Sequence, residues 1–134
     1  MRVLDAQDVS KQFLLRHNRS GDLKIRVLGV FESRHRERWP AVTARAVGSL
    51  AELVELAFPL LAVGGRLVAW KRGDIGAEMQ AAGRAIGALG GGSIADEAVR
   101  VTGLTRHRLV VVTKHGRTDA AFPRDPATRR RQPW

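Results

Sequence analysis

The sequence contains no cysteine, which excludes disulfide bonds, thiolate metal sites and cysteine nucleophiles. Its four histidines are scattered and show no metal-ligand spacing, so no metal is expected; they are His17, His35, His107 and His115. No apolar run approaches the roughly 20 residues needed to cross a bilayer, and the N-terminus lacks the basic and then apolar pattern of a signal peptide. We therefore expect a cytoplasmic protein with no membrane partner, and a monomer.

Acidic residues are few beside basic ones. The chain has 23 Lys and Arg against 13 Asp and Glu, a net charge of +10. This balance favours a polyanionic partner, with nucleic acid the leading candidate, although arginine-rich composition is also common in proteins from GC-rich genomes. The cations gather in three groups, at 34–38, 106–108 and 129–131.

The 134 residues, 44% of them hydrophobic and 27% charged, fit one globular domain with a real core. A short apolar run at 42–47 is followed by a segment with helical spacing of leucines and then by an apolar run at 61–71. A helix that joins two strands makes them parallel, and ligands of such sheets gather at the carboxyl ends of the strands. Arg45 and Lys71 stand at those two ends.

Periodicity and turn residues predict the remaining elements. Ser49 is an expected N-cap, with Glu52 at the capping-box spacing, and Pro59 predicts an irregular last turn of that helix. We expect strands at 3–5, 25–28, 41–44 and 65–70, helices at 8–17, 49–61 and 76–89, and an antiparallel edge hairpin made of 97–101 and 108–113. From residue 114 onward, little regular structure is expected.

Several motifs resemble the ribosomal small subunit methyltransferase G family, also called glucose-inhibited division protein B. Two of them are Val-Thr-Ala-Arg-Ala-Val at 42–47 and Leu-Ala-Val-Gly-Gly-Arg-Leu-Val-Ala-Trp-Lys at 61–71, and Thr-Ala-Arg-Ala is the most specific part. The stretches 3–7 with 13–14, 29–32 and 122–126 also match, so the resemblance covers nearly the whole chain. It implies methylation of guanine N7 in small-subunit ribosomal RNA, with S-adenosylmethionine as cofactor and the ribosomal RNA or the small subunit as partner.

The family's first strand and glycine-rich cofactor loop have no counterpart before residue 3. The glycines at 90–92 follow a helix and those at 64–65 open a strand, whereas a cofactor loop follows a strand and opens a helix. The resemblance thus implies a Rossmann-like class I methyltransferase fold that is truncated at its N-terminus: an α/β, mostly parallel sheet with an antiparallel edge hairpin. We expect a partial methyltransferase domain at 1–113 and a basic, proline-containing tail at 114–134.

The resemblance assigns three residues near the N-terminus to the cofactor. Asp5 would accept hydrogen bonds from the ribose hydroxyls, although a carboxylate there also favours the following helix dipole. Glu32, with Phe31, matches the segment that contacts adenine, although Phe31 fits a plain core position equally well. The family has Arg and Ala where this chain has Val30 and Phe31.

Arg45 would bind the methionine carboxylate of the cofactor or an RNA phosphate, because its fork suits either anion; a salt bridge to Asp5 or Glu32 is the alternative. Lys71 and Arg72 would steer RNA phosphate, or simply be solvated at a strand end. Four cations of the tail match an RNA-clamping segment: Arg124, Arg129, Arg130 and Arg131. The alternative is a solvated, disordered tail. No catalytic acid or base is expected.

Three functions remain open on the sequence. The first is the ribosomal RNA guanine-N7 methyltransferase, carried by a chain whose own activity is open because of the missing loop. The second is a non-catalytic RNA-binding remnant of such an enzyme. The third is another nucleotide-binding α/β protein, such as a reductase, which the lack of a glycine-rich loop after a strand disfavours.

Overall fold

The computed structural model describes residues 35–45 and 48–134. They form a four-stranded sheet with the strand order β1-β2-β4-β3. Its strands are β1 (Trp39–Arg45), β2 (Leu61–Arg72), β3 (Gly92–Ala98) and β4 (His107–Lys114), and its helices are α2 (Leu50–Ala57), α3 (Gly76–Ala88) and α4 (Pro126–Arg131). The expected elements at 3–5, 8–17 and 25–28 lie outside the described residues.

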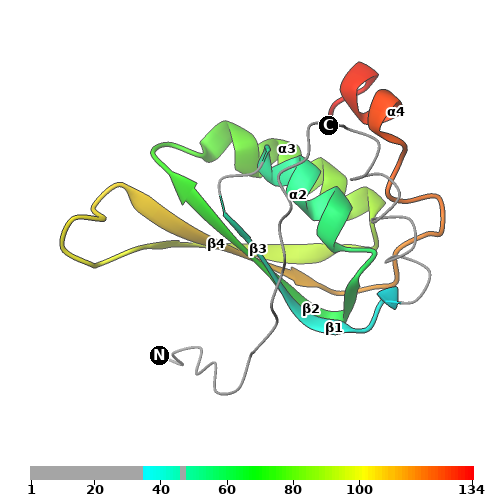
Figure 1. Cartoon of the computed structure of the whole chain (residues 1–134), viewed down its shortest axis with the longest axis horizontal. Coiled ribbons are helices and arrows are strands. Elements are labelled where there is room, and N and C mark those ends of the chain that lie inside the picture. Colours follow the sequence, from blue (N-terminus) through cyan, green and yellow to red (C-terminus); the bar gives the residue numbers. More distant parts are fainter. Residues whose placement is uncertain (1–34, 46–47) are drawn as a thin grey trace, which may run out of the picture.

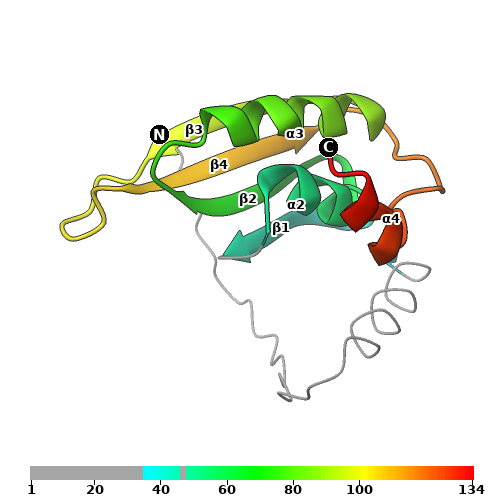
Figure 2. The same ribbon diagram turned by 90° about the horizontal axis from the view of Figure 1, so that it is seen from above.

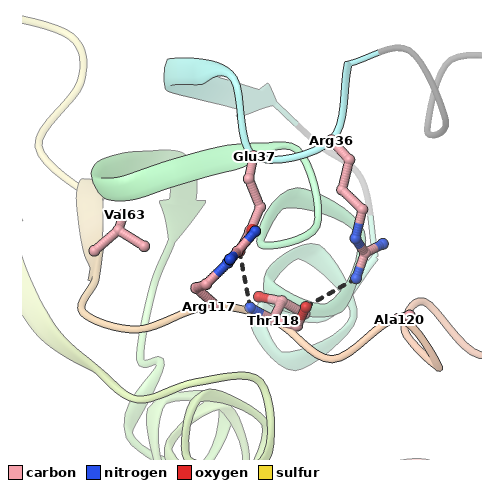
Figure 3. A pocket seen from close by; sticks show the side chains of 6 residues that line it. All are labelled: Arg36, Glu37, Val63, Arg117, Thr118 and Ala120. Atoms are coloured by element: carbon pink, nitrogen blue, oxygen red, sulfur yellow. Dashed lines mark hydrogen bonds and ion pairs between the residues drawn. The ribbon is translucent and has the colours of Figure 1, made fainter.

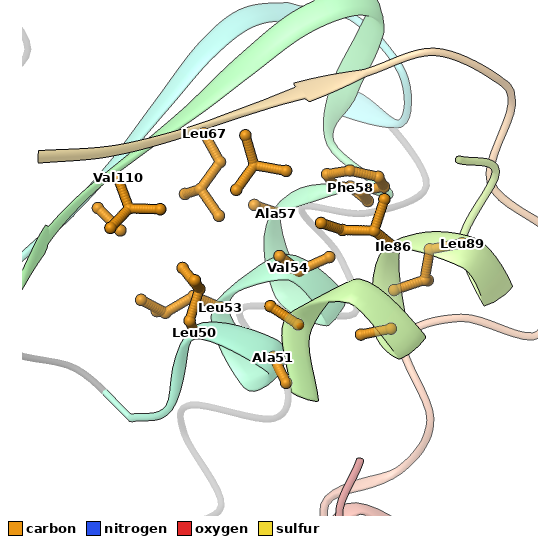
Figure 4. Close-up of a cluster of buried hydrophobic side chains, with 14 of the residues drawn as sticks. Leu50, Ala51, Leu53, Val54, Ala57, Phe58, Leu67, Ile86, Leu89 and Val110 are labelled. Atoms are coloured by element: carbon orange, nitrogen blue, oxygen red, sulfur yellow. The ribbon is translucent and has the colours of Figure 1, made fainter. Parts of the chain in front are cut away.

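Helices α2 and α3 lie together over one face of the sheet (Figures 1 and 2). The side chain of Ser49 caps α2 as expected, accepting a hydrogen bond of 3.2 Å from the backbone nitrogen of Glu52. The apolar residues of α2 face the core, where Leu50, Val54 and Phe58 are fully buried against Leu67 and other strand residues (Figure 4). Burial of this apolar surface is the main source of stability for such a layer.

The strand-helix-strand prediction is confirmed. β1 and β2 are parallel, and Arg45 pairs in register with Trp70 at their carboxyl ends. The helix between them ends at Ala57, before the expected 61, because Pro59 lies in an irregular turn and Leu61 already belongs to β2. β2 therefore begins earlier than the expected residue 65.

The edge hairpin is also confirmed, with a shifted first strand. β3 pairs antiparallel with β4 from Gly92 to Ala98 instead of running over 97–101. The chain joins the sheet directly after the glycine stop of α3, and the ladder ends where the turns at 99–106 begin. Because β4 is also antiparallel to β2, the described sheet is mixed and not mostly parallel: it has one parallel pairing and two antiparallel ones.

The segment after β4 is more structured than expected. Residues Pro126–Arg131 form α4, capped by Asp125. Arg36 donates hydrogen bonds to the carbonyls of Thr118 and Phe122, at 3.0 and 2.9 Å. The Thr118 hydroxyl donates to the carbonyl of Leu89 at 2.7 Å. Backbone and side-chain contacts thus fasten this segment to the domain.

Candidate functional site at the carboxyl ends of the strands

Three of the predicted site residues line one cavity of about 680 Å³ at the carboxyl ends of β1 and β2. They are Arg45, Lys71 and Arg72, and Gly48, Trp70, Leu104 and His107 complete the lining. Cations from the ends of both parallel strands therefore line this cavity, although Arg45 and Lys71 extend from opposite faces of the sheet. The roles predicted for them stay predictions, and Asp5, Phe31 and Glu32 lie outside the described residues.

Arg45 projects from the sheet face opposite α2 and α3. Val42 and Ala44 pack against the helix-side core, so the alternation of a strand places Arg45 on the other face. It is exposed, and its guanidinium has no hydrogen-bond or ion-pair partner among residues 35–45 and 48–134. A free guanidinium beside a cavity is suited to bind a carboxylate or a phosphate in bidentate geometry.

Lys71 points to the helix side, where it joins three elements. Its ammonium donates to the carbonyl of Gly48 at 2.9 Å and forms an ion pair of 2.6 Å with Glu78. The same Glu78 carboxylate accepts a 2.9 Å bond from the backbone nitrogen of Leu50, at the start of α2. Burial raises the pKa of Glu78, but the bonds from Lys71 and Leu50 outweigh it, and the pKa lies below its ordinary value. Sequence reasoning missed this bracing role.

Arg72 is exposed at the end of β2 and, within the described ranges, has no side-chain partner. Its partner in the ladder is His107, the first residue of β4. The Nδ1 atom of His107 is buried and makes no hydrogen bond inside the part of the chain that the structure describes. His107 and Trp70 lie in segments that the sequence analysis singled out, at 106–108 and 61–71, but neither was assigned a role, because their positions at the cavity come from strand pairing.

The predicted tail cations lie at a second cavity, of about 350 Å³, between α4 and the start of α2. Arg124, Arg129 and Arg130 line it together with Ser49 and Trp134. Arg131 is exposed at the end of α4. The predicted RNA-binding residues therefore fall into two groups, one at the cavity lined by Gly48 and the other around the cavity lined by Ser49.

Arg124 has an internal partner that the sequence did not reveal. Its guanidinium bonds both carboxylate oxygens of Glu55, at 3.0 and 2.8 Å, and its backbone nitrogen donates to the same group at 2.8 Å. The guanidinium also lies 4.5 Å from the centre of the Trp134 ring, whose indole nitrogen donates to Glu55 at 2.6 Å. Burial raises the pKa of Glu55, but these bonds outweigh it, so the net pKa is lowered. Arg124 thus anchors the C-terminal segment to α2.

A third cluster lies around the amino end of β2, away from the predicted site. Lys114, fully buried at the end of β4, donates to Glu37 at 2.9 Å and to the carbonyls of Phe58 and Leu61 at 2.7 and 2.8 Å. Figure 3 shows Glu37 with Arg117, which donates to it at 3.1 Å, in the cavity nearby. Neither Glu37 nor Lys114 was predicted. No sequence pattern marked them, because residues 109–112 are apolar throughout and only the structure shows that Lys114 continues the period-two burial of Val110 and Val112.

Acid is expected to weaken this cluster. Burial raises the pKa of Glu37, but hydrogen bonds from Lys114, Thr118 and Arg117 lower it from 4.5 to about 2. The unfolded chain therefore binds the proton at higher pH than the folded one, so the stabilisation is complete above about pH 5 and is lost as the pH falls toward 2. Thermal melts should show that the melting temperature declines steeply as the pH falls across this range. Glu37→Gln should make the melting temperature depend less on pH, whereas Glu97→Gln, at an exposed strand position, should leave this dependence unchanged.

Among the described residues, no group of three or more His, Asp or Glu side chains is placed to hold a metal ion. A search of the same residues found no helix of the length and hydrophobicity required to span a bilayer.

Comparison with known proteins finds many related sequences. The chain is 35% identical over 133 residues to ribosomal RNA small subunit methyltransferase G of Ligilactobacillus salivarius, an alignment that covers 98% of this chain and 55% of the relative. The proteins of the same name from Roseiflexus castenholzii and Chloroflexus aggregans are 45% and 48% identical over 69% and 66% of this chain, and 40% and 37% of their own lengths. No family model matches. The chain spans about half or less of the relatives that it matches.

Proposed function

Because this chain belongs to the ribosomal RNA small subunit methyltransferase G family, we propose that it takes part in the S-adenosylmethionine-dependent methylation of guanine N7 in small-subunit ribosomal RNA. The names of the relatives support methylation of small-subunit ribosomal RNA. The observation that carries the assignment to this chain is the cavity at the strand ends, where Arg45 and Arg72 have no hydrogen-bond or ion-pair partner among residues 35–45 and 48–134.

The residues of this cavity fit the anionic parts of such a reaction. The guanidinium of Arg45 can hold the carboxylate of the methyl donor or an RNA phosphate, since both present two oxygens to its fork. Arg72, which also has no side-chain partner in the described ranges, offers a second positive charge on the same sheet face. The ribose and adenine contacts proposed for Asp5, Phe31 and Glu32 come from the family resemblance alone.

Guanine N7 carries a lone pair and needs no general base to become nucleophilic. The bound cofactor supplies an electrophilic sulfonium methyl group. The protein then has to align N7 with that methyl group, exclude competing geometries and balance charge. Arg45 holds an anion at the strand ends, and Lys71 fixes the cavity wall through Gly48 and Glu78. We accordingly assign no catalytic acid or base.

A non-catalytic RNA-binding role is the second candidate, and the position of the glycines favours it. Gly64 and Gly65 lie inside β2, and the glycines at 90–92 connect α3 to β3. The loops that follow a strand and open a helix in the described sheet carry Gly48 before α2 and Gly73 with Gly76 before α3, and neither has the Gly-x-Gly-x-x-Gly spacing of a cofactor-binding loop.

Calorimetric titration of the full chain with S-adenosylmethionine separates the two candidates. We expect micromolar binding that Arg45→Ala abolishes, because the substitution removes the free guanidinium at the cavity. Arg66→Ala is the matched control, since Arg66 is an exposed arginine on the same sheet face, in the middle of β2 and outside the cavity lining. If a chain shown to be folded by circular dichroism binds no S-adenosylmethionine, methyl transfer by this chain is wrong and RNA binding alone remains.

A further inference from the structure

Trp70 is one of few large apolar side chains that the described fold leaves exposed, with 39% of its surface accessible. It lies at the carboxyl end of β2 and lines the same cavity as Arg45 and Arg72. Leu67 and Ala69 belong to the helix-side core, so the strand alternation directs Trp70 to the opposite face, together with Arg72. Packing against α2 and α3 therefore does not explain this indole.

The cations beside Trp70 are placed by the sheet itself. Arg45 is its ladder partner on β1, and Arg72 follows two residues later on β2, so both project from the face that carries the indole. Neither guanidinium has a partner within residues 35–45 and 48–134. An aromatic ring between two unpaired guanidinium groups combines a stacking surface with two phosphate-binding groups.

The other wall of the cavity comes from the turns that join β3 to β4, which extend beyond the sheet in Figures 1 and 2. Leu104, in these turns, lines the cavity opposite the strand ends. The turns are held by backbone bonds from Leu104 to Val101 and from His107 to Leu104, each of 2.9 Å. A further 2.9 Å bond, from Gly73 to Arg106, fixes them to the end of β2. The cavity thus has apolar walls from a strand and a braced turn.

We propose that Trp70 is a stacking platform for one unpaired base of the RNA, with Arg72 holding one flanking phosphate and Arg45 holding the other when it does not bind the cofactor carboxylate. This inference rests on the proposed function, because it takes RNA as the partner. Proteins read RNA mainly through unpaired bases that stack on aromatic side chains or guanidinium planes. This cavity has an indole for stacking, an aliphatic wall and cations at its rim, so it can bind an unpaired base in this way. Double-stranded RNA keeps its bases stacked and cannot use it.

The test is fluorescence anisotropy of a labelled single-stranded RNA of about 12 nucleotides, within the usual site size, titrated with the full chain. Trp70→Leu, which keeps the position apolar, should weaken binding about tenfold, the loss typical of one stacked base. Trp70→Phe should recover most of the affinity. The salt dependence should be unchanged in Trp70→Leu, whereas Arg72→Ala should reduce its slope by about one unit, because only the arginine releases counterions.

Val63→Ala is the matched control, since Val63 is an exposed apolar residue at the other end of β2. Duplex RNA of the same sequence should bind with no dependence on Trp70. The proposal is wrong if Trp70→Leu binds single-stranded RNA within threefold of the unchanged chain, if the folded chain binds no RNA, or if the substitution weakens S-adenosylmethionine binding and leaves RNA binding intact. If the cofactor does not bind but the RNA affinity depends on Trp70, the proposed methyl transfer fails and the stacking platform stands.

Discussion

Lys114→Met is expected to destabilise the domain by about 3–5 kcal/mol, the usual cost of removing one partner from a buried ion pair. The side chain is fully buried, and its ammonium satisfies Glu37 and the carbonyls of Phe58 and Leu61. Methionine fills a similar volume but leaves the carboxylate and both carbonyls without their donor. Because domains are stable by only about 5–15 kcal/mol, equilibrium denaturation should show a large loss, or no folded baseline at all.

Arg117→Met provides the control for this prediction. Arg117 contacts the same Glu37 carboxylate, but its side chain is 87% exposed, so its removal should cost less than about 1 kcal/mol. In a double-mutant cycle, Glu37→Gln should recover part of the loss in the Lys114→Met background, because it removes a carboxylate charge that has lost its buried partner and keeps only the exposed Arg117 as a cation. Equal effects of Lys114→Met and Arg117→Met would contradict a buried, stabilising lysine.

Hydrophobic spacing and turn residues predicted the elements whose positions depend mainly on residues nearby in the sequence. The helical spacing after Ser49, the apolar run of β2 and the turn at Gly90 were sufficient to place α2, β2 and α3. The placement of Arg45 and Lys71 at the same edge of the sheet followed from one topological rule, that a helical crossover makes two strands parallel. Strand ends were less exact, since the ladder of β3 depends on its partner β4 and not on its own sequence.

Contacts between distant residues could not be read in this way. Glu37 and Lys114 are 77 residues apart, and Glu37 has a φ of 51°, a left-handed conformation that is uncommon outside glycine. Trp70 resembled an ordinary strand residue until its register with Arg45 placed it at the cavity. The same limit explains the interpretation of Arg124 as a free RNA-binding cation, because Glu55 lies 69 residues earlier in the chain.

Arg124→Ala is accordingly expected to destabilise the domain, by about 3–5 kcal/mol. Glu55 is fully buried on α2, and without the guanidinium its carboxylate retains only the Trp134 indole and a backbone nitrogen as donors. The C-terminal segment would lose its anchor, so limited proteolysis should remove it faster than in the unchanged chain. Urea denaturation gives the free energy, and protease digestion followed by mass spectrometry gives the site of opening.

Arg131→Ala is the comparison that separates stability from RNA binding. Arg131 is exposed at the end of α4, so its removal should change stability by less than about 0.5 kcal/mol while still removing one cation from the predicted RNA-binding tail. A Glu55→Leu, Arg124→Met chain removes the buried pair as a unit and should recover much of the stability, because apolar replacement of a whole ion pair is often tolerated. If that folded double variant also binds RNA as the unchanged chain does, Arg124 acts by anchoring the segment. If it is stable but binds RNA weakly, the guanidinium itself contacts the RNA, and the Glu55 pair is only its resting position.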